Sequence, residues 1–133
     1  MDENLYLSVP PAHPLALFNE ISFDDLNGES VLLLSQIGFW NEICLKKIPQ
    51  SHLLIQEDHT IFSELTRASA LPNFRSNITI LREANEENRI SIPISDKEAH
   101  VKYFAIYHKT NHKLFNSIKN EIKNIDWSKT INE

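Results

Sequence analysis

Hydrophobic residues change their spacing several times along this chain, and the changes predict strands that alternate with helices. Leu5, Leu7 and Val9 alternate with more polar positions, as in a half-buried strand. Three prolines within residues 10–14 then prevent regular pairing and predict a bent connector. The continuous apolar run Val31–Leu34 is typical of a strand that is covered on both faces.

Two helices are predicted between this buried strand and residue 68. The first begins near Gly38 and ends near Ile48, and Phe39, Ile43 and Cys44 share one face of it. A strand over Leu53–Ile55 separates it from a second helix that Asp58 can cap. The apolar stripe of the second helix consists of Ile61, Phe62, Leu65 and Ala68. This repeated strand-then-helix order indicates an α/β layer architecture.

The stretch from residue 70 to residue 84 fits two descriptions. In the first, Ala70–Phe74 is a short strand, and Ser76 or Asn77 caps a brief helix that continues through Ala84. In the second, Asn77–Leu81 is itself a strand, because its branched residues favour extended backbone.

Two strands and a helix are predicted in the last third of the chain. Arg89–Ile94 is predicted as a strand that lies at a sheet edge or has Pro93 near its end, because Pro93 cannot donate a ladder hydrogen bond. Val101–Tyr107 is rich in aromatic and branched residues and predicts a further strand. Thr110 or Asn111 then caps an amphipathic helix. Its apolar face comprises Leu114, Phe115, Ile118, Ile122 and Ile125.

Composition excludes several classes of protein. A net charge of −5 argues against a dedicated nucleic-acid binder, and no apolar run is long enough to predict a membrane helix. The single Cys44 excludes an internal disulfide and predicts a reducing, cytoplasmic location. Gly28 and Gly38 are too far apart for a phosphate-binding loop, so no nucleotide cofactor, and no cofactor of any other kind, is predicted.

Four segments, taken in order, carry a family resemblance. A strand leads into His13–Ala16, and Ser22–Glu29, predicted as a turn that Ser22 caps, precedes the buried strand. Arg89–Asp96 and Val101–Lys109 then lead into the amphipathic helix. In this order and spacing, most of the chain resembles the effector-binding domain of LysR-type transcriptional regulators.

The resemblance implies an α/β fold of the type II periplasmic-binding-protein kind, with a mixed sheet flanked by helices. It implies that residues 7–97, approximately, form the second effector subdomain and that 98–127 return to the first, with 128–133 as a frayed tail. The family's DNA-binding domain, its linker helix and most of its first subdomain are expected to be missing, which implies a partial regulator. Ala68–Pro72 stands where the family has a Gly-x-Gly segment.

The resemblance also implies a ligand site, because effectors of this family bind in a cleft between the subdomains. The corresponding residues are Ser35, Gln36, Ile37, Gly38 and Phe39, between the buried strand and a helix start. Free backbone N–H groups there favour a carboxylate or a phosphate, and a glycine permits close approach. The alternative is an ordinary turn in which Ser35 caps the helix.

A second polar cluster lies beside another predicted helix start and consists of Asn73, Arg75, Ser76 and Asn77. Arg75 could pair with an anionic ligand through its planar guanidinium. Helix caps and solvated charges are the alternative explanation of these residues. His108 and His112 straddle a strand-to-helix boundary, so no metal site is predicted.

No catalytic constellation is predicted: Cys44 fits the core, and Asp58 fits a helix cap. The chain is therefore predicted to be the ligand-sensing portion of a LysR-like regulator. Its predicted partners are a small anionic effector and further copies of itself, with no direct DNA contact and no membrane. The rival is a protein-interaction module that exposes strand edges and the final helix. A solute-binding protein or an enzyme on the same fold is a third, weaker alternative.

Overall fold

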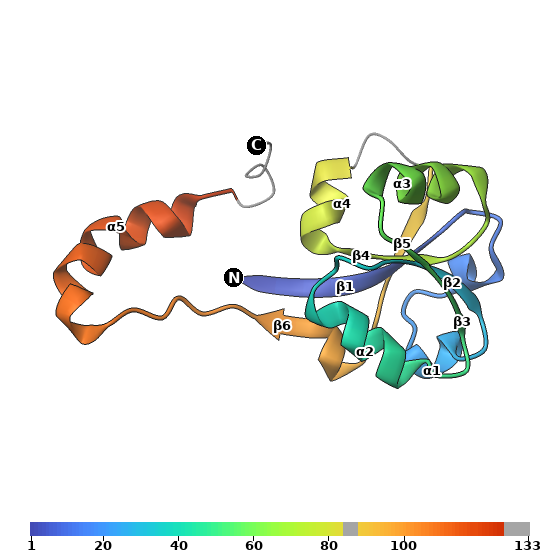
Figure 1. The fold of residues 1–133 in the computed structure, drawn as a ribbon, viewed down its shortest axis with the longest axis horizontal. Helices are drawn as coiled ribbons and strands as arrows, with labels where there is room; N and C mark the ends of the chain where they lie inside the picture. Colours follow the sequence, from blue (N-terminus) through green and yellow to red (C-terminus); the bar gives the residue numbers. More distant parts are fainter. Residues whose placement is uncertain (84–87, 127–133) are drawn as a thin grey trace.

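A computed structural model shows a mixed sheet with helices on both faces and a long extension from one side (Figure 1). It describes residues 1–83 and 88–126. The strands are β1 (Asp2–Val9), β2 (Ser30–Leu34), β3 (His52–Gln56), β4 (Asn73–Ser76), β5 (Ile90–Pro93) and β6 (His100–Lys102). The helices are α1 (Phe23–Leu26), α2 (Phe39–Lys47), α3 (His59–Ala68), α4 (Asn77–Glu83) and α5 (His112–Asn124). Short 3₁₀ turns η1, η2 and η3 cover Pro14–Leu17, Lys97–Ala99 and Lys109–Asn111.

The strand order is β3-β2-β4-β1-β5, and β6 pairs with the first residues of β1. Strand β2 pairs in parallel with β3 and β4, whereas β1 runs antiparallel to β4, β5 and β6. The predicted mixed α/β architecture is therefore confirmed. Strand β5 lies at an edge, as its proline requires, and β3 occupies the opposite edge.

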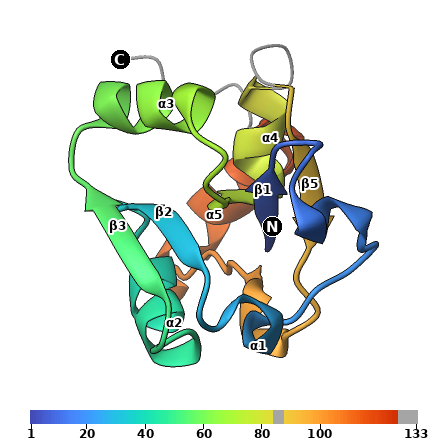
Figure 2. The ribbon, with the colours of Figure 1, turned by 90° about the vertical axis from the view of Figure 1, so that its right-hand side faces the viewer.

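The two faces of the sheet are covered differently, by α1 and α2 on one side and by α3 and α4 on the other (Figure 2). The main hydrophobic core lies on the α1 and α2 side, where Leu7, Leu33 and Cys44 are fully or almost fully buried. On the α3 side, the buried residues include the polar pair Thr66 and Asn73. Burial of Val31, Leu32 and Leu33 confirms that β2 is covered on both faces.

The order in the first description of residues 70–84 is confirmed, because β4 is followed directly by α4. The strand covers Asn73–Ser76 rather than Ala70–Phe74, and the predicted helix end at Ala84 lies outside the described residues. The Thr79 hydroxyl accepts a hydrogen bond of 2.8 Å from the Ser76 backbone, and the Ser76 hydroxyl accepts one of 3.4 Å from the Thr79 backbone. This reciprocal cap stabilises a helix start, so the branched residues that follow continue as helix rather than strand. Helices α2 and α3 also begin and end within a residue or two of their predicted limits.

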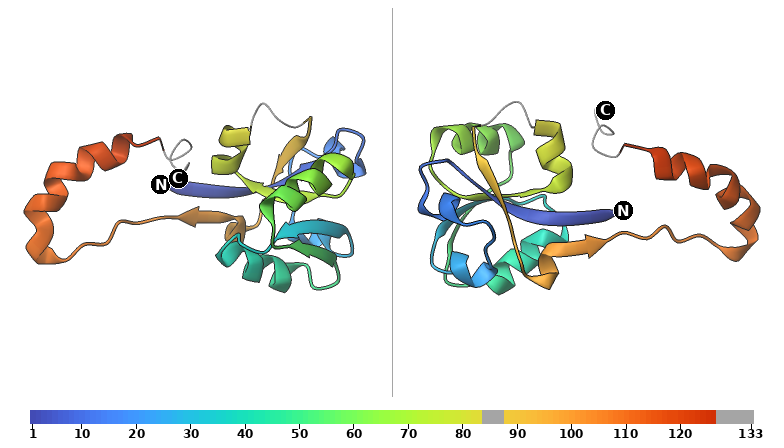
Figure 3. Two further views of the ribbon diagram at one scale, coloured as in Figure 1. Left: turned by 45° about the horizontal axis from the view of Figure 1, so that its top comes forward. Right: turned by 180° about the vertical axis from the view of Figure 1, so that it is seen from behind.

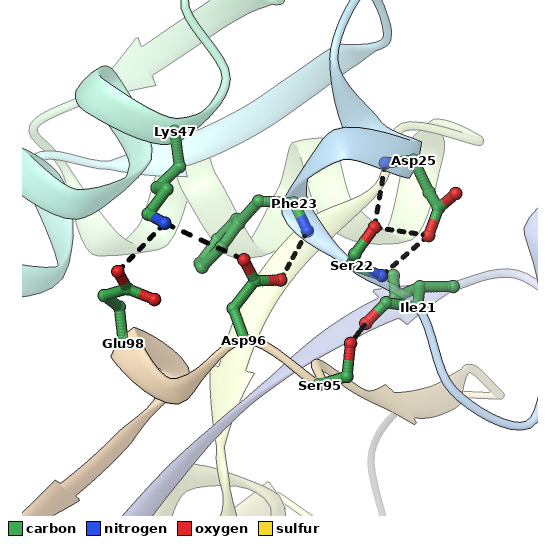
Figure 4. A network of polar contacts seen from close by, with 8 residues as sticks. All are labelled: Ile21, Ser22, Phe23, Asp25, Lys47, Ser95, Asp96 and Glu98. Carbon is green, nitrogen blue, oxygen red and sulfur yellow. Dashed lines mark hydrogen bonds and ion pairs between the residues drawn. The ribbon is translucent and has the colours of Figure 1, made fainter.

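A polar network holds the ends of several elements together (Figure 4). Ser22 and Asp25 form the predicted cap of α1, and Asp96 accepts a 2.8 Å hydrogen bond from the Phe23 backbone. Lys47 at the end of α2 lies 2.9 Å from Glu98 and 3.8 Å from Asp96. Their hydrogen bond raises the pKa of Lys47 and lowers the pKa of Glu98. These contacts fix the chain just before β6.

Residues 103–126, here called the arm, extend away from the rest of the molecule (Figures 1 and 3). The strand predicted over Val101–Tyr107 is wrong beyond Lys102, because no other strand of the described residues lies beside that part of the chain. Helix α5 forms as predicted, but none of its residues is buried. No described helix is both long and apolar enough to cross a membrane.

Candidate functional site

A groove of about 400 Å³ opens where β2 and β4 end and where β1 begins. Its lining comes from the loop after β2, the first residues of α2, β4, α4 and the start of the arm. Four of the predicted loop residues lie together there, namely Gln36, Ile37, Gly38 and Phe39, and Arg75 joins them from β4. In open α/β sheets, ligands bind outside the carboxyl ends of the strands, which is the place of this groove.

The start of α2 leaves hydrogen-bond donors without side-chain partners. Gly38 is the residue before the helix, with a φ of +63° that favours glycine, and it offers no side chain to the first backbone N–H groups. Trp40 lines the groove and is only 5% exposed, yet its indole N–H has no acceptor among the described residues. Unpaired buried donors are costly, so an acceptor supplied by a ligand would stabilise this end of the groove.

A smaller space of about 80 Å³ continues from the groove beneath α3. Both spaces share Ile37, Phe74 and Arg75 in their linings, and the smaller one adds Leu32 and Phe62. The lining of the smaller space is therefore largely apolar, with one guanidinium. This combination fits a small molecule that has an apolar part and an acidic group.

The groove lining also includes an acidic residue. Glu3 of β1 accepts a hydrogen bond of 2.7 Å from the Tyr103 hydroxyl, and both residues line the groove. Partial burial, followed by the bond to Glu3, raises the pKa of Tyr103 to about 12. Tyr103 therefore remains a neutral donor at physiological pH. The lining of the groove thus combines the start of α2 and Arg75 with a carboxylate from the start of β1.

Two predicted site residues lie outside this groove. Ser35 donates its backbone N–H to Gln56, and its carbonyl accepts a bond from the Asn41 side chain, so it does not cap α2. Asn73 is fully buried, where its amide donates to the Thr66 hydroxyl at 3.0 Å. The structure therefore brings together five of the seven predicted residues.

Sequence reasoning missed Glu3, Trp40 and Tyr103 as groove residues. Trp40 precedes the buried Cys44 by one helical turn, a spacing that could have placed it on the inner face of α2. Glu3 and Tyr103 are 100 residues apart in sequence, and no local pattern predicts that they meet. Burial raises the pKa of Cys44 to about 12, which fits a core residue rather than a nucleophile. Within the described residues, no group of three or more potential metal ligands comes together.

No family model matches the chain, and no curated protein matches it in sequence. Similar solved structures exist. The regulatory domain of MetR, a LysR-family regulator from N. meningitidis, superposes with a TM-score of 0.64 at 14% identity, over 94% of this chain and 65% of that one. The effector-binding domain of QuiR in complex with shikimate gives 0.58 at 14% identity, over 93% and 64%. ArgBP from T. maritima gives 0.61 at 18% identity, over 96% and 56%.

These likenesses concern the fold, and the chain spans less than two thirds of each of these three structures. The match to MetR covers 94% of the 133 residues. Residues 1–102 alone cannot supply that share, so the match extends into the arm. The matched proteins are regulators and solute-binding proteins rather than enzymes. The predicted fold class and the resemblance to LysR-type domains are thereby confirmed: the chain has the α/β fold of LysR-family effector-binding domains, which solute-binding proteins share.

Proposed function

We propose that this chain is the ligand-sensing portion of a LysR-like transcriptional regulator and that it binds a small anionic metabolite in the groove beside α2. The observation that carries the proposal is the set of hydrogen-bond donors that lines the groove. Backbone N–H groups at the start of α2 have no side-chain cap, and the Trp40 indole N–H has no acceptor among the described residues. The Arg75 guanidinium lines the same space. A carboxylate or phosphate can accept from several of these donors at once.

The acidic residue of the lining refines the ligand class. Glu3 is an acceptor and a negative charge, so a ligand that carries a hydroxyl or amino group in addition to its acid would be favoured. QuiR was solved with shikimate, a hydroxylated carboxylate, which is consistent with this class but does not identify the ligand of this chain.

The proposed mechanism is conformational. Residues 7–97, approximately, would act as the second effector subdomain, and 98–127 as the strand and helix that belong to the first. Tyr103, from residues 98–127, lines the groove together with Gln36, from residues 7–97. A ligand held between the two parts would bias their relative orientation, which is how such domains report binding. In a whole regulator, DNA contact would come from another domain, in a cytoplasmic homo-oligomer.

Thermal unfolding in the presence of small carboxylates, shikimate among them, and inorganic phosphate tests the proposal. A ligand at 100 times its dissociation constant stabilises the folded state by about 2.7 kcal/mol, which raises the melting temperature by several degrees. Gln36→Ala and Arg75→Met should reduce that shift. Gln50→Ala is the matched control, because Gln50 is an exposed glutamine outside the groove lining.

If no compound of the panel shifts the melting temperature, or if the shift is unchanged in Gln36→Ala and Arg75→Met, the groove is not the ligand site. The second candidate function, a protein-interaction module, is favoured by the exposed apolar residues of the arm.

A further inference from the structure

The smaller space beneath α3, here called the inner chamber, is built from one part of the chain. Its lining runs from Leu32 in β2 to Thr79 in α4, and among the described residues none of the arm contributes to it. The proposed second effector subdomain, approximately residues 7–97, contains the whole lining. The size and chemistry of the inner chamber therefore do not depend on where the arm lies.

The walls of the inner chamber are apolar. Leu32 is fully buried, Phe74 is 9% exposed, and Phe62 adds an aromatic ring from α3. The Thr79 hydroxyl donates to the Ser76 carbonyl at 3.0 Å, so its hydrogen is already used in the cap of α4. Burying a polar group against such walls is costly, whereas an alkyl group is stabilised when it leaves water.

Two basic side chains line both the inner chamber and the groove, namely His59 and Arg75. His59 packs beside Phe62 at the start of α3, with ring centroids 6.4 Å apart. Because Arg75 borders both spaces, a carboxylate that pairs with its guanidinium can extend an attached alkyl group into the inner chamber.

Volume limits what the inner chamber can hold. It measures about 80 Å³, against about 400 Å³ for the groove. An apolar cavity of about 150 Å³ binds benzene, and the inner chamber has roughly half of that volume. It is therefore suited to a short alkyl group and too small for an aromatic ring.

We propose that the inner chamber receives the alkyl group of the ligand and that Phe62 sets the upper limit on the size of this group. The ligand is then a short aliphatic acid rather than an aromatic one. This inference rests on the proposed function, because it requires that the groove bind the acid.

A series of 2-hydroxy acids tests the inference, because its members share the acid and the hydroxyl and differ only in the side chain. Lactate, 2-hydroxybutanoate and 2-hydroxy-3-methylbutanoate carry methyl, ethyl and isopropyl groups, and mandelate carries a phenyl ring. Dissociation constants are measured by calorimetry on the full chain. We expect affinity to rise about fourfold with each carbon that the inner chamber buries. Mandelate should bind about tenfold more weakly than 2-hydroxy-3-methylbutanoate, because it overfills the chamber.

Enlarging the chamber should change this order. Phe62→Ala is expected to raise the affinity for mandelate at least to that for 2-hydroxy-3-methylbutanoate. Leu65→Ala is the matched control, because Leu65 is half-buried on the same helix and lines neither space, and it should leave the order unchanged. Thermal unfolding verifies that each variant folds, and Phe62→Val replaces Phe62→Ala if that variant does not.

The outcomes separate this inference from the proposed function. Equal affinities along the aliphatic series, mandelate binding as tightly as 2-hydroxy-3-methylbutanoate in the wild type, or an unchanged order in Phe62→Ala would overturn the inference. Binding of phosphate or shikimate without any response to the aliphatic acids would also overturn it, while the proposed function would stand. If no anion binds at all, the proposed function and this inference fail together.

Discussion

Arg89 shows how much of this fold depends on single side chains. Its guanidinium donates to the Ser8 hydroxyl at 3.1 Å and to the Ser8 carbonyl at 2.8 Å. It also donates to the Leu71 carbonyl at 2.6 Å and to the Thr66 carbonyl at 3.1 Å. One residue thereby joins β1, α3 and the segment before β4. That segment is where the family resemblance expected glycines, and the arginine holds its backbone in place.

We predict that Arg89→Met lowers the free energy of unfolding by about 3 kcal/mol, because several part-buried carbonyls lose a charged donor. Urea denaturation provides the measurement. Lys46→Met is the control, since Lys46 forms only a surface pair with Glu42 at 3.7 Å and should change stability by less than about 0.5 kcal/mol. Equal effects of the two substitutions would contradict this role for Arg89.

Asp25 gives a prediction about pH. Hydrogen bonds from the Ser22 backbone and then from the Ser22 hydroxyl lower the pKa of Asp25 below its ordinary value of 3.8. A lowered folded-state pKa means that Asp25 stabilises the protein above pH 3.8 and that this contribution disappears as pH falls through the folded value. We expect Asp25→Asn to cost about 1 kcal/mol at pH 6, as other helix caps do.

Comparing wild type with Asp25→Asn in acid tests whether the stabilisation depends on the negative charge of Asp25. The difference between wild type and Asp25→Asn, measured by urea denaturation at several pH values, should shrink below pH 4. A difference that stays constant down to pH 2.5 would mean that the charge of Asp25 has no part in the cap.

At the scale of elements, burial separates the sheet from the arm. We predict that Leu33→Ala in β2 costs about 3 kcal/mol, because Leu33 is 1% exposed and its removal leaves a cavity. Ile118→Ser on α5 should change stability by less than about 0.5 kcal/mol at concentrations where the chain is monomeric, since Ile118 is 38% exposed. Comparable losses in the two variants would mean that α5 packs against the sheet in solution.

Local signals explain which elements could be predicted from sequence. The caps at Ser22 and Asp58, the proline in β5 and the apolar run of β2 each act over a few residues, and each element forms near its predicted place. The failure at Val101–Tyr107 has a different origin. Strand propensity describes how side chains fit a pleated surface, and beyond Lys102 the described chain provides no neighbouring strand.

Some residues of the candidate site could likewise be predicted from local patterns, and others depend on contacts between distant parts of the chain. Gln36–Phe39 follow β2, and Arg75 lies near the end of β4, so both could be placed from sequence at the edge of the sheet where these strands end. Burial of Asn73 was not predictable, because it depends on Thr66 and on the side of the sheet that α3 covers. Glu3 and Tyr103 meet only through the pairing of β1 with β6, which sets a register between the two ends of the chain.

At the scale of the whole molecule, an acidic α/β unit carries a basic arm with exposed apolar residues. The groove has residues of both parts in its lining. Tyr103 at the base of the arm contributes to the groove, so arm position and ligand occupancy should be coupled. Such a coupling requires only that the ligand contact both parts.

The measurement that tests ligand sensing most directly is an NMR titration of the isotope-labelled chain with the compound that gives the largest thermal shift. Trp40 supplies an indole N–H signal at the groove, and the backbone amide of Leu17, which is 89% exposed and outside the groove lining, serves as an internal reference. We predict saturable shifts of the Trp40 indole and of the backbone amides of residues 36–40 and 74–76, with the Leu17 amide unchanged. Saturable shifts confined to other residues, or none at ligand concentrations that stabilise the protein, would contradict the proposed site.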